Sequence, residues 1–195
     1  MSKRDKPRAS IEDEARARRA KLMDLTTDRV GKKRGMWGDD ERLKMDTIAL
    51  GIPQFDEIID GGWRRGRIGM VVGEASMGKT LVTQWTIVAF QRRGLVCGFI
   101  DPEKTFDAEW FTKTGVKTNE LIVARPSSTE EAFDLAGEWA ENGMDLIVVD
   151  SLAALVPKYR AEHELAEKEV MGLAAHKISE GLAQFTNQNW DSFML

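Results

Sequence analysis

The sequence predicts an α/β fold in which a mainly parallel sheet is flanked by helices. Short runs that are apolar throughout alternate with stretches of helical character, a pattern typical of parallel strands buried on both faces. Glycines and acidic residues follow several of these runs. In a parallel sheet such residues gather beyond the C-terminal strand ends, where open α/β sheets bind ligands.

The first 46 residues differ in charge from the rest of the chain. Residues 1–35 carry 12 Lys/Arg against 6 Asp/Glu, whereas the remainder carries 16 against 26. Acidic residues precede basic ones over about 10–24, an order that complements a helix dipole and predicts a helix there. The Gly-rich, charged stretch 26–46 is typical of a linker. Such a basic arm suits contact with nucleic acid or an acidic neighbouring subunit, and a solvated tail is the alternative.

Residues 47–195 form the predicted compact domain. A short helix is expected at 52–59, led by Pro53, before a glycine-rich turn. The helix over 128–142 begins with Ser128 and Glu131, which have the spacing of a capping box. The predicted strands cover 68–72, 95–100, 121–124 and 146–149, and the helices that alternate with them cover 78–93, 106–114, 128–142 and about 163–187.

Residues 73–80 read GEASMGKT and match the pattern G-x-x-x-x-G-K-[ST]. The motif follows a predicted strand and opens a predicted helix, which is the context that a P-loop requires. Its glycines let successive backbone N–H groups face phosphate oxygens, and the helix N-terminus adds a positive partial charge. We expect ATP here, with Lys79 on the β- and γ-phosphates and Thr80 on Mg²⁺. The predicted ATP-binding residues of the motif are Gly73, Glu74, Ala75, Ser76, Met77, Gly78, Lys79 and Thr80.

An acidic residue ends the apolar strand predicted at 146–149. Asp150 would lie at the same sheet edge as the P-loop, which is the Walker B arrangement that helps hold Mg²⁺ and its water shell. An Asp also ends strands for turn reasons, so this residue alone would be weak evidence. Together the two motifs predict a P-loop nucleoside triphosphatase that uses ATP and Mg²⁺.

Two further acids follow the strand predicted at 95–100. Asp101 or Glu103 could polarise a water molecule for attack on the γ-phosphate, and spacing alone does not choose between them. In the alternative interpretation both are loop acids, with Asp101 serving as an N-cap.

Four segments of the chain resemble the ATPase core of bacterial and phage RecA recombinases. They read GEASMGKT at 73–80, CGFIDPEKTFDAEW at 97–110, IVVDSLAALVPK at 147–158 and MGLAAHKIS at 171–179. The second and fourth segments distinguish RecA recombinases from other P-loop ATPases, because many P-loop ATPases share the first and third. The resemblance extends over 66–175. More loosely, the N-terminal helix resembles the oligomerisation arm of the family.

The resemblance implies a RecA-like core and a role for individual residues. The chain would be a DNA-dependent ATPase of recombination and repair that forms a homo-oligomeric filament on single-stranded DNA. Glu103 matches the catalytic glutamate that activates the attacking water. Asp107 matches the acid that binds the adenine amino group. Trp110 matches an aromatic that stacks on adenine, and Trp keeps the stacking face that Tyr has in the family. A packed helix residue is the alternative for Trp110.

The segment 157–171 stands where the family has its first DNA-binding loop. It is one residue longer than the family pattern and more acidic, and His176 stands where the family usually has Arg. The acidic balance and the His in place of Arg both weaken the expected phosphate contacts. A solvated helix start without DNA contact is the alternative interpretation.

The family pattern continues past residue 195 with a strand ending in a Gln, a second DNA-binding loop and a C-terminal domain. Residues 193–195 resemble the beginning of that strand. We therefore expect an incomplete core at 47–195, apparently truncated at its C-terminus. The other functional hypotheses are an ATPase of the RadA or KaiC kind and a truncated, non-catalytic nucleotide-binding module.

Composition also bears on the location of the protein. Cys97 is the single cysteine, which fits a reducing compartment. No apolar run approaches 18 residues, and the charged N-terminus is not followed by the apolar stretch of a secretory signal. We expect a cytoplasmic protein without a membrane partner.

Overall fold

The computed structural model describes residues 11–187 and 193–195, except for 33, 45 and 158–166. The chain divides into two compact units, Met1–Lys44 and Met45–Leu195.

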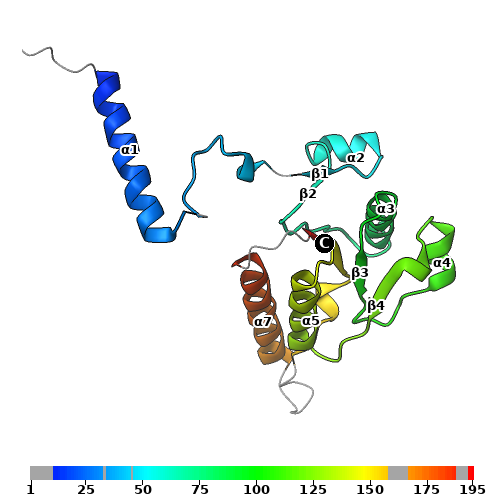
Figure 1. The fold of residues 1–195 in the computed structure, drawn as a ribbon. Helices are drawn as coiled ribbons and strands as arrows, with labels where there is room; N and C mark the ends of the chain where they lie inside the picture. Colours follow the sequence, from blue (N-terminus) through cyan, green and yellow to red (C-terminus); the bar gives the residue numbers. More distant parts are fainter. Residues whose placement is uncertain (1–10, 33, 45, 158–166, 188–192) are drawn as a thin grey trace, which may run out of the picture. The chain divides into compact units, whose positions relative to one another are not determined.

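The first unit contains helix α1 (Ile11–Val30) and a short 3₁₀ turn, η1 (Glu41–Leu43) (Figure 1). The predicted helix over about 10–24 is therefore too short, and part of the predicted linker is helical. Nothing after position 24 stops a helix until Gly31, which has φ +87° and whose N–H donates to the Thr27 carbonyl at 2.8 Å. No residue of α1 is buried.

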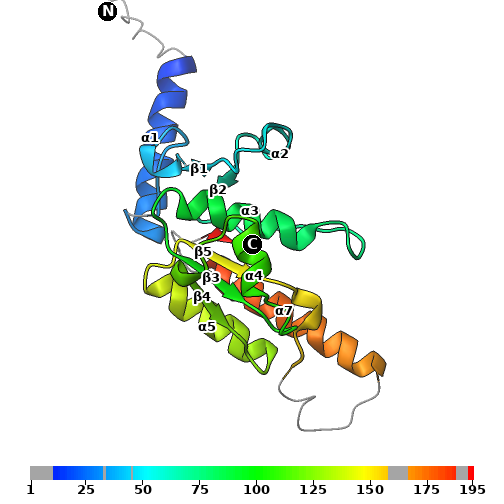
Figure 2. The same cartoon turned by 90° about the vertical axis from the view of Figure 1, so that its right-hand side faces the viewer.

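The second unit contains a four-stranded sheet with the order β4-β3-β5-β6, all pairs parallel. Figure 2 shows α3 and α4 on one face of this sheet and α5 and α7 on the other. This confirms the predicted α/β class. The strands are β3 (Cys97–Ile100), β4 (Leu121–Ala124), β5 (Leu146–Val149) and β6 (Phe193–Met194), and the helices are α3 (Lys79–Gln91), α4 (Ala108–Lys113), α5 (Thr129–Glu141) and α7 (Glu167–Asn187). Shorter elements are β1 (Thr47–Ile48), α2 (Pro53–Ile58), β2 (Trp63–Arg64), η2 (Thr118–Glu120) and η3 (Leu152–Ala154).

Alternating residues of the central strand β5 supply the two layers of the core. Leu146 and Val148 belong to the hydrophobic cluster under α3 and α4. Ile147 belongs to the cluster that includes residues of α5 and α7. Because successive strand side chains point to opposite faces, one apolar strand serves both layers.

The α5–α7 layer depends on a close approach at Gly181. A Cβ built at this position would lie 2.4 Å from ring atoms of Phe133, so only glycine fits beside that ring. At the start of α5, the Ser128 hydroxyl accepts a hydrogen bond from the Glu131 N–H at 3.2 Å, as a capping box requires. The Glu131 carboxylate accepts from the N–H of Ser127 at 2.6 Å.

The predicted strand over 68–72 is wrong. Ile68 forms only an isolated parallel bridge with Met194, and the N–H of Gly69 donates to the Met194 carbonyl at 2.8 Å. Beyond this bridge the side chains of Met70 and Val72 are 72% and 78% exposed. The described part of its neighbour, β6, offers only two strand residues, so the ladder does not extend along 68–72. The strand expected from residue 193 is confirmed by β6.

Candidate active site

The P-loop connects the 68–72 segment to α3 and is closed by its own lysine. Gly78 caps α3 in the left-handed region, with φ +87°, and Ser76 also has a positive φ of 62°. The Lys79 ammonium donates to the carbonyls of Gly73 at 3.0 Å and Glu74 at 2.8 Å. The Lys79 ammonium, which was predicted to bind phosphate, therefore braces the start of the loop.

The end of the P-loop meets the end of β5. The Thr80 hydroxyl donates to Oδ2 of Asp150 at 2.7 Å, although the two residues are 70 positions apart in the sequence. This contact brings together the two residues predicted to ligate Mg²⁺. A hydroxyl and a carboxylate are hard oxygen ligands, and Mg²⁺ characteristically takes one or two protein oxygens while water and phosphate fill the rest. The donor set thus fits the ion. Elsewhere in the described residues, no group of three or more His, Cys, Asp or Glu is arranged to hold a metal.

Glu103 lies at the same edge. The Ser151 hydroxyl donates to Oε1 of Glu103 at 2.6 Å. Ser151 follows Asp150 in the chain, so adjacent residues after β5 contact the P-loop threonine and the candidate base.

Asp101 has a different environment from Glu103. Its carboxylate is fully buried and accepts hydrogen bonds from the N–H groups of Thr105 and Phe106 and from the Arg125 side chain. Glu103 is exposed. Of the two acids that sequence spacing left open, Asp101 is thus occupied by the protein itself, whereas Glu103 faces solvent near Ser151. Sequence reasoning missed Arg125. The available clue was its place at the end of the strand that follows Asp101.

The two residues predicted to contact adenine lie on α4. Oδ1 of Asp107 caps this helix by accepting from the N–H groups of Glu109 at 2.9 Å and Trp110 at 3.1 Å. Trp110 is 52% exposed. Within the described residues, no hydrogen bond joins Asp107 to Thr80, Asp150 or Glu103. The adenine roles therefore stay predictions.

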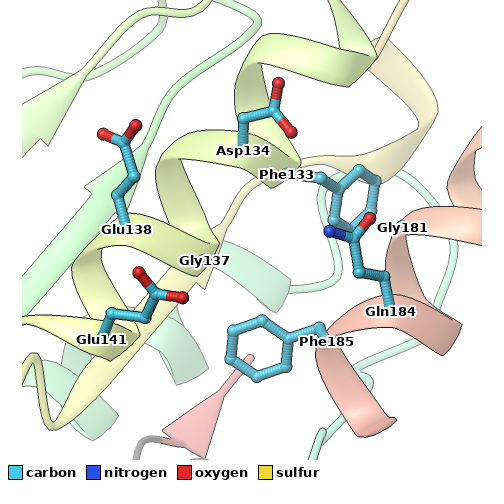
Figure 3. Close-up of a pocket in the computed structure, with 8 residues that line it drawn as sticks. All are labelled: Phe133, Asp134, Gly137, Glu138, Glu141, Gly181, Gln184 and Phe185. Atoms are coloured by element: carbon cyan, nitrogen blue, oxygen red, sulfur yellow. The ribbon is translucent and has the colours of Figure 1, made fainter. Parts of the chain in front are cut away.

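A separate groove of about 250 Å³ lies between α5 and α7. Figure 3 shows Phe133 and Phe185 reaching it from the two helices, with Glu138 extending away from α7. Its lining includes three carboxylates and no Lys or Arg, so it does not suit a nucleotide phosphate. The lining residues are Phe133, Asp134, Gly137, Glu138, Glu141, Gly181, Gln184 and Phe185, and none is a predicted site residue.

Comparison with known proteins identifies the family of the chain. The family model of the RecA N-terminal domain matches residues 20–192. The chain belongs to the RecA family. It is 38% identical to Protein RecA of Ectopseudomonas oleovorans over 151 residues, which cover 76% of this chain and 43% of that protein. It is 36% identical to Protein RecA of Cutibacterium acnes over 179 residues, which cover 88% and 51%. The chain spans about half the length of these curated relatives.

Membership of the RecA family confirms the resemblance stated from the four sequence segments. The candidate first DNA-binding loop, 157–171, cannot be placed in the site, since 158–166 lie outside the described residues. Among the helices that the structure describes, none combines the length and apolar character needed to span a bilayer.

Proposed function

We propose that the chain is a DNA-dependent ATPase of recombination and repair, which binds ATP with Mg²⁺ and hydrolyses it to ADP and phosphate. The observation that carries this proposal is the pair of hydrogen bonds Thr80–Asp150 and Ser151–Glu103. They bring the P-loop, the Walker B carboxylate and a candidate base together at one edge of a parallel sheet. RecA family membership supports the assignment.

Phosphate binding would use the backbone of 73–80 and the Lys79 ammonium. Lys79 now bonds to the Gly73 and Glu74 carbonyls, and phosphate oxygens would compete with these for its protons. Thr80 and Asp150 would hold Mg²⁺, which supplies charge neutralisation for the β- and γ-phosphates. Because Thr80 donates to Asp150, the two oxygens already lie within reach of one small cation.

Glu103 would accept the proton of the attacking water. The Ser151 hydroxyl donates to Oε1, which leaves Oε2 available for that water. The exposed position of Glu103 gives solvent direct access to it. Transfer of the proton to the carboxylate raises the nucleophilicity of the water as it attacks the γ-phosphorus.

Adenine would be recognised by α4. Oδ1 of Asp107 is used in capping, so Oδ2 is the oxygen that would accept from the adenine amino group. The half-exposed Trp110 ring, three residues further on, would stack on the base. Base and phosphates would then bind to different elements of the same sheet edge.

The partners would be single-stranded DNA and further copies of the chain. The segment 1–35 has an excess of basic residues, which suits a contact with DNA phosphates or with an acidic neighbouring copy in a filament. DNA binding would act mainly on the phosphate backbone, so it would be tolerant of sequence and sensitive to salt. The single cysteine favours a reducing cytoplasmic location.

The decisive experiment measures ATP hydrolysis by the 195-residue chain at low salt, with and without single-stranded DNA, in Mg²⁺ and in EDTA. We expect Mg²⁺-dependent turnover that DNA stimulates and that rising salt suppresses. ATP binding without turnover under every condition would instead indicate a non-catalytic nucleotide-binding module. Turnover that DNA never stimulates would refute the DNA-dependent part of the proposal.

A further inference from the structure

The turn that carries Glu103 is built around one buried side chain. Asp101 is fully buried at the end of β3. Its Oδ1 accepts from the Thr105 N–H at 2.9 Å, and its Oδ2 accepts from the Phe106 N–H at 3.1 Å. The carboxylate thus takes up two backbone donors that the turn would otherwise leave without partners.

These bonds close the turn around Glu103. The Lys104 N–H donates to the Asp101 carbonyl at 3.3 Å, and Lys104 has a φ of 59°. Glu103 therefore sits between a residue anchored in β3 and two residues anchored to the Asp101 side chain. Because these bonds hold the backbone on both sides of Glu103, the position of Asp101 sets the point from which the Glu103 side chain leaves the backbone.

Arg125 supplies the positive charge next to this carboxylate. Its Nε donates to Oδ2 of Asp101 at 3.1 Å, and its side chain is 48% exposed. The sheet register explains the contact, since Ile100 pairs with Ala124 and the Asp101 N–H donates to the Ala124 carbonyl at 2.8 Å. A buried carboxylate without a cationic partner is strongly unfavourable, and the Arg125 guanidinium supplies that partner.

We propose that Asp101 and Arg125 are a positioning pair for Glu103. The pair holds this candidate base opposite Ser151 and thereby sets the rate of hydrolysis. The inference rests on the proposed ATPase function. Neither residue touches the nucleotide in this scheme. They act through the turn at 101–106.

The helix that would bind adenine has supports of its own. Phe106 packs against Phe111 with ring centroids 4.5 Å apart, and both rings contact Phe99 of β3. Asp107 separately caps the helix. Loss of the positioning pair should therefore disturb Glu103 more than α4, and this separates an effect on turnover from an effect on nucleotide binding.

The test compares Asp101→Asn, Arg125→Gln and Arg125→Lys with the unmodified chain. Asn cannot accept from both backbone N–H groups and Arg125 as the carboxylate does. For Asp101→Asn we expect kcat to fall by roughly 10- to 100-fold while the KM for ATP stays within about twofold, because a displaced base slows the chemistry without weakening binding. Arg125→Gln should lower kcat less, and Arg125→Lys should restore part of that loss. Asp134→Asn, at an exposed position of α5, is the matched control and should leave both constants unchanged.

Two kinetic outcomes would overturn the proposal. One is an unchanged kcat in Asp101→Asn. The other is a fall in kcat that is matched by an equal weakening of fluorescent-nucleotide binding, which would indicate general damage to the site. A loss of kcat in the double variant Asp101→Asn/Glu103→Gln as large as the product of the two single losses would also contradict it, because a residue acting through Glu103 has little left to affect once the base is removed.

Amide hydrogen exchange separates this inference from the proposed function. If the unmodified chain hydrolyses no ATP, the proposed function fails, but the turn can still be examined. We expect the Thr105 and Phe106 amides to be protected in the unmodified chain and to lose protection at least tenfold in Asp101→Asn, while amides of β5 keep theirs. Equal protection of the turn in both proteins would refute the positioning pair.

Discussion

Two loops at the same sheet edge are held in opposite ways. The P-loop at 73–80 is braced from within, by the Lys79 ammonium on its own carbonyls. The loop at 101–107 is held by hydrogen bonds to the buried Asp101 carboxylate, which also accepts from the Arg125 side chain. In the first loop the brace is also the predicted ligand-binding group. In the second loop the brace and the candidate catalytic group, Glu103, are different residues.

This difference indicates what each loop can tolerate. A change of Lys79 would remove the predicted phosphate-binding group and the brace of the loop together, so its two effects cannot be separated. A change of Glu103 leaves Asp101, Thr105 and Phe106 in place, so it should remove chemistry alone. Comparing nucleotide affinity with turnover in variants of the two loops tests this distinction.

The largest effect is expected from Glu103→Gln. The amide cannot accept the proton of the attacking water, so kcat should fall by roughly 10²- to 10⁴-fold while ATP affinity is retained. Steady-state hydrolysis and equilibrium binding of a fluorescent ATP analogue measure the two quantities. Glu138→Gln, on the exposed surface of α5, is the control. A variant that binds ATP much more weakly would show that Glu103 also shapes the binding site.

The next effect is expected from Lys79→Ala. Loss of a charge-assisted contact to phosphate, together with the brace on Gly73, should weaken ATP binding by about 100-fold, or ~3 kcal/mol. Isothermal titration with ATP and Mg²⁺ gives the affinity. Lys79→Arg keeps the charge and should lose less. Undiminished affinity in Lys79→Ala would mean that the backbone N–H groups suffice.

These loops also show what could be predicted from the sequence. The P-loop motif and the Walker B Asp150 are local patterns, and the structure brings them together through Thr80. The choice of Glu103 over Asp101 came from the family resemblance. Its partner Ser151 lies 48 residues away, and the Arg125 that neutralises Asp101 lies 24 residues away. Such pairings depend on which strands are neighbours in the sheet, and strand order cannot be predicted from any single segment of the sequence.

The strands give the same lesson. The segments 121–124 and 146–149 coincide with β4 and β5, because each has four apolar residues bounded by polar ones and pairs with β3 over its full length. The segment 68–72 is just as apolar, yet only Ile68 forms a bridge. Apolar content records a preference for burial, whereas a strand also needs a partner of equal length alongside it.

A smaller effect, on stability alone, is expected from Gly181→Ala. The added Cβ would meet the Phe133 ring, and such overpacking costs roughly 1–3 kcal/mol. Gly137→Ala is the matched control, since a Cβ there meets nothing within 4 Å and alanine favours a helix by about 0.5–1 kcal/mol. Urea denaturation measures both. Since neither glycine lies in the two loops, affinity and kcat below the transition should not change. Equal stability of the two variants would contradict the close packing of α5 on α7.

The smallest effect concerns Cys97 of β3, the strand that carries the second loop. Burial, with a lesser contribution from the nearby Asp145 charge, raises the thiol pKa from 9.0 to about 12. Because the folded state holds this proton more tightly, the thiol contributes stability below pH 9 that is lost as the pH rises from about 9 to about 12. At pH 8 iodoacetamide should label the folded chain far more slowly than the urea-unfolded chain, since the thiolate is the reactive form. Equal labelling rates would show that β3 opens readily.

The pairing of β3 with both β4 and β5 has a consequence for the order in which the chain folds. Cys97 lies beside Leu121 on one side and Leu146 on the other. The strand β3 therefore cannot pair on both sides until β5, almost 50 residues later in the chain, has been synthesised. The hydrogen bond from Thr80 likewise cannot form until Asp150 has been synthesised. Parallel pairings of this kind require long loops to close before any contact stabilises them, and they fold slowly for that reason. On the ribosome, α3 and the β3–β4 pair would therefore emerge while one edge of β3 is unpaired, and the candidate catalytic edge would assemble only when β5 pairs with β3.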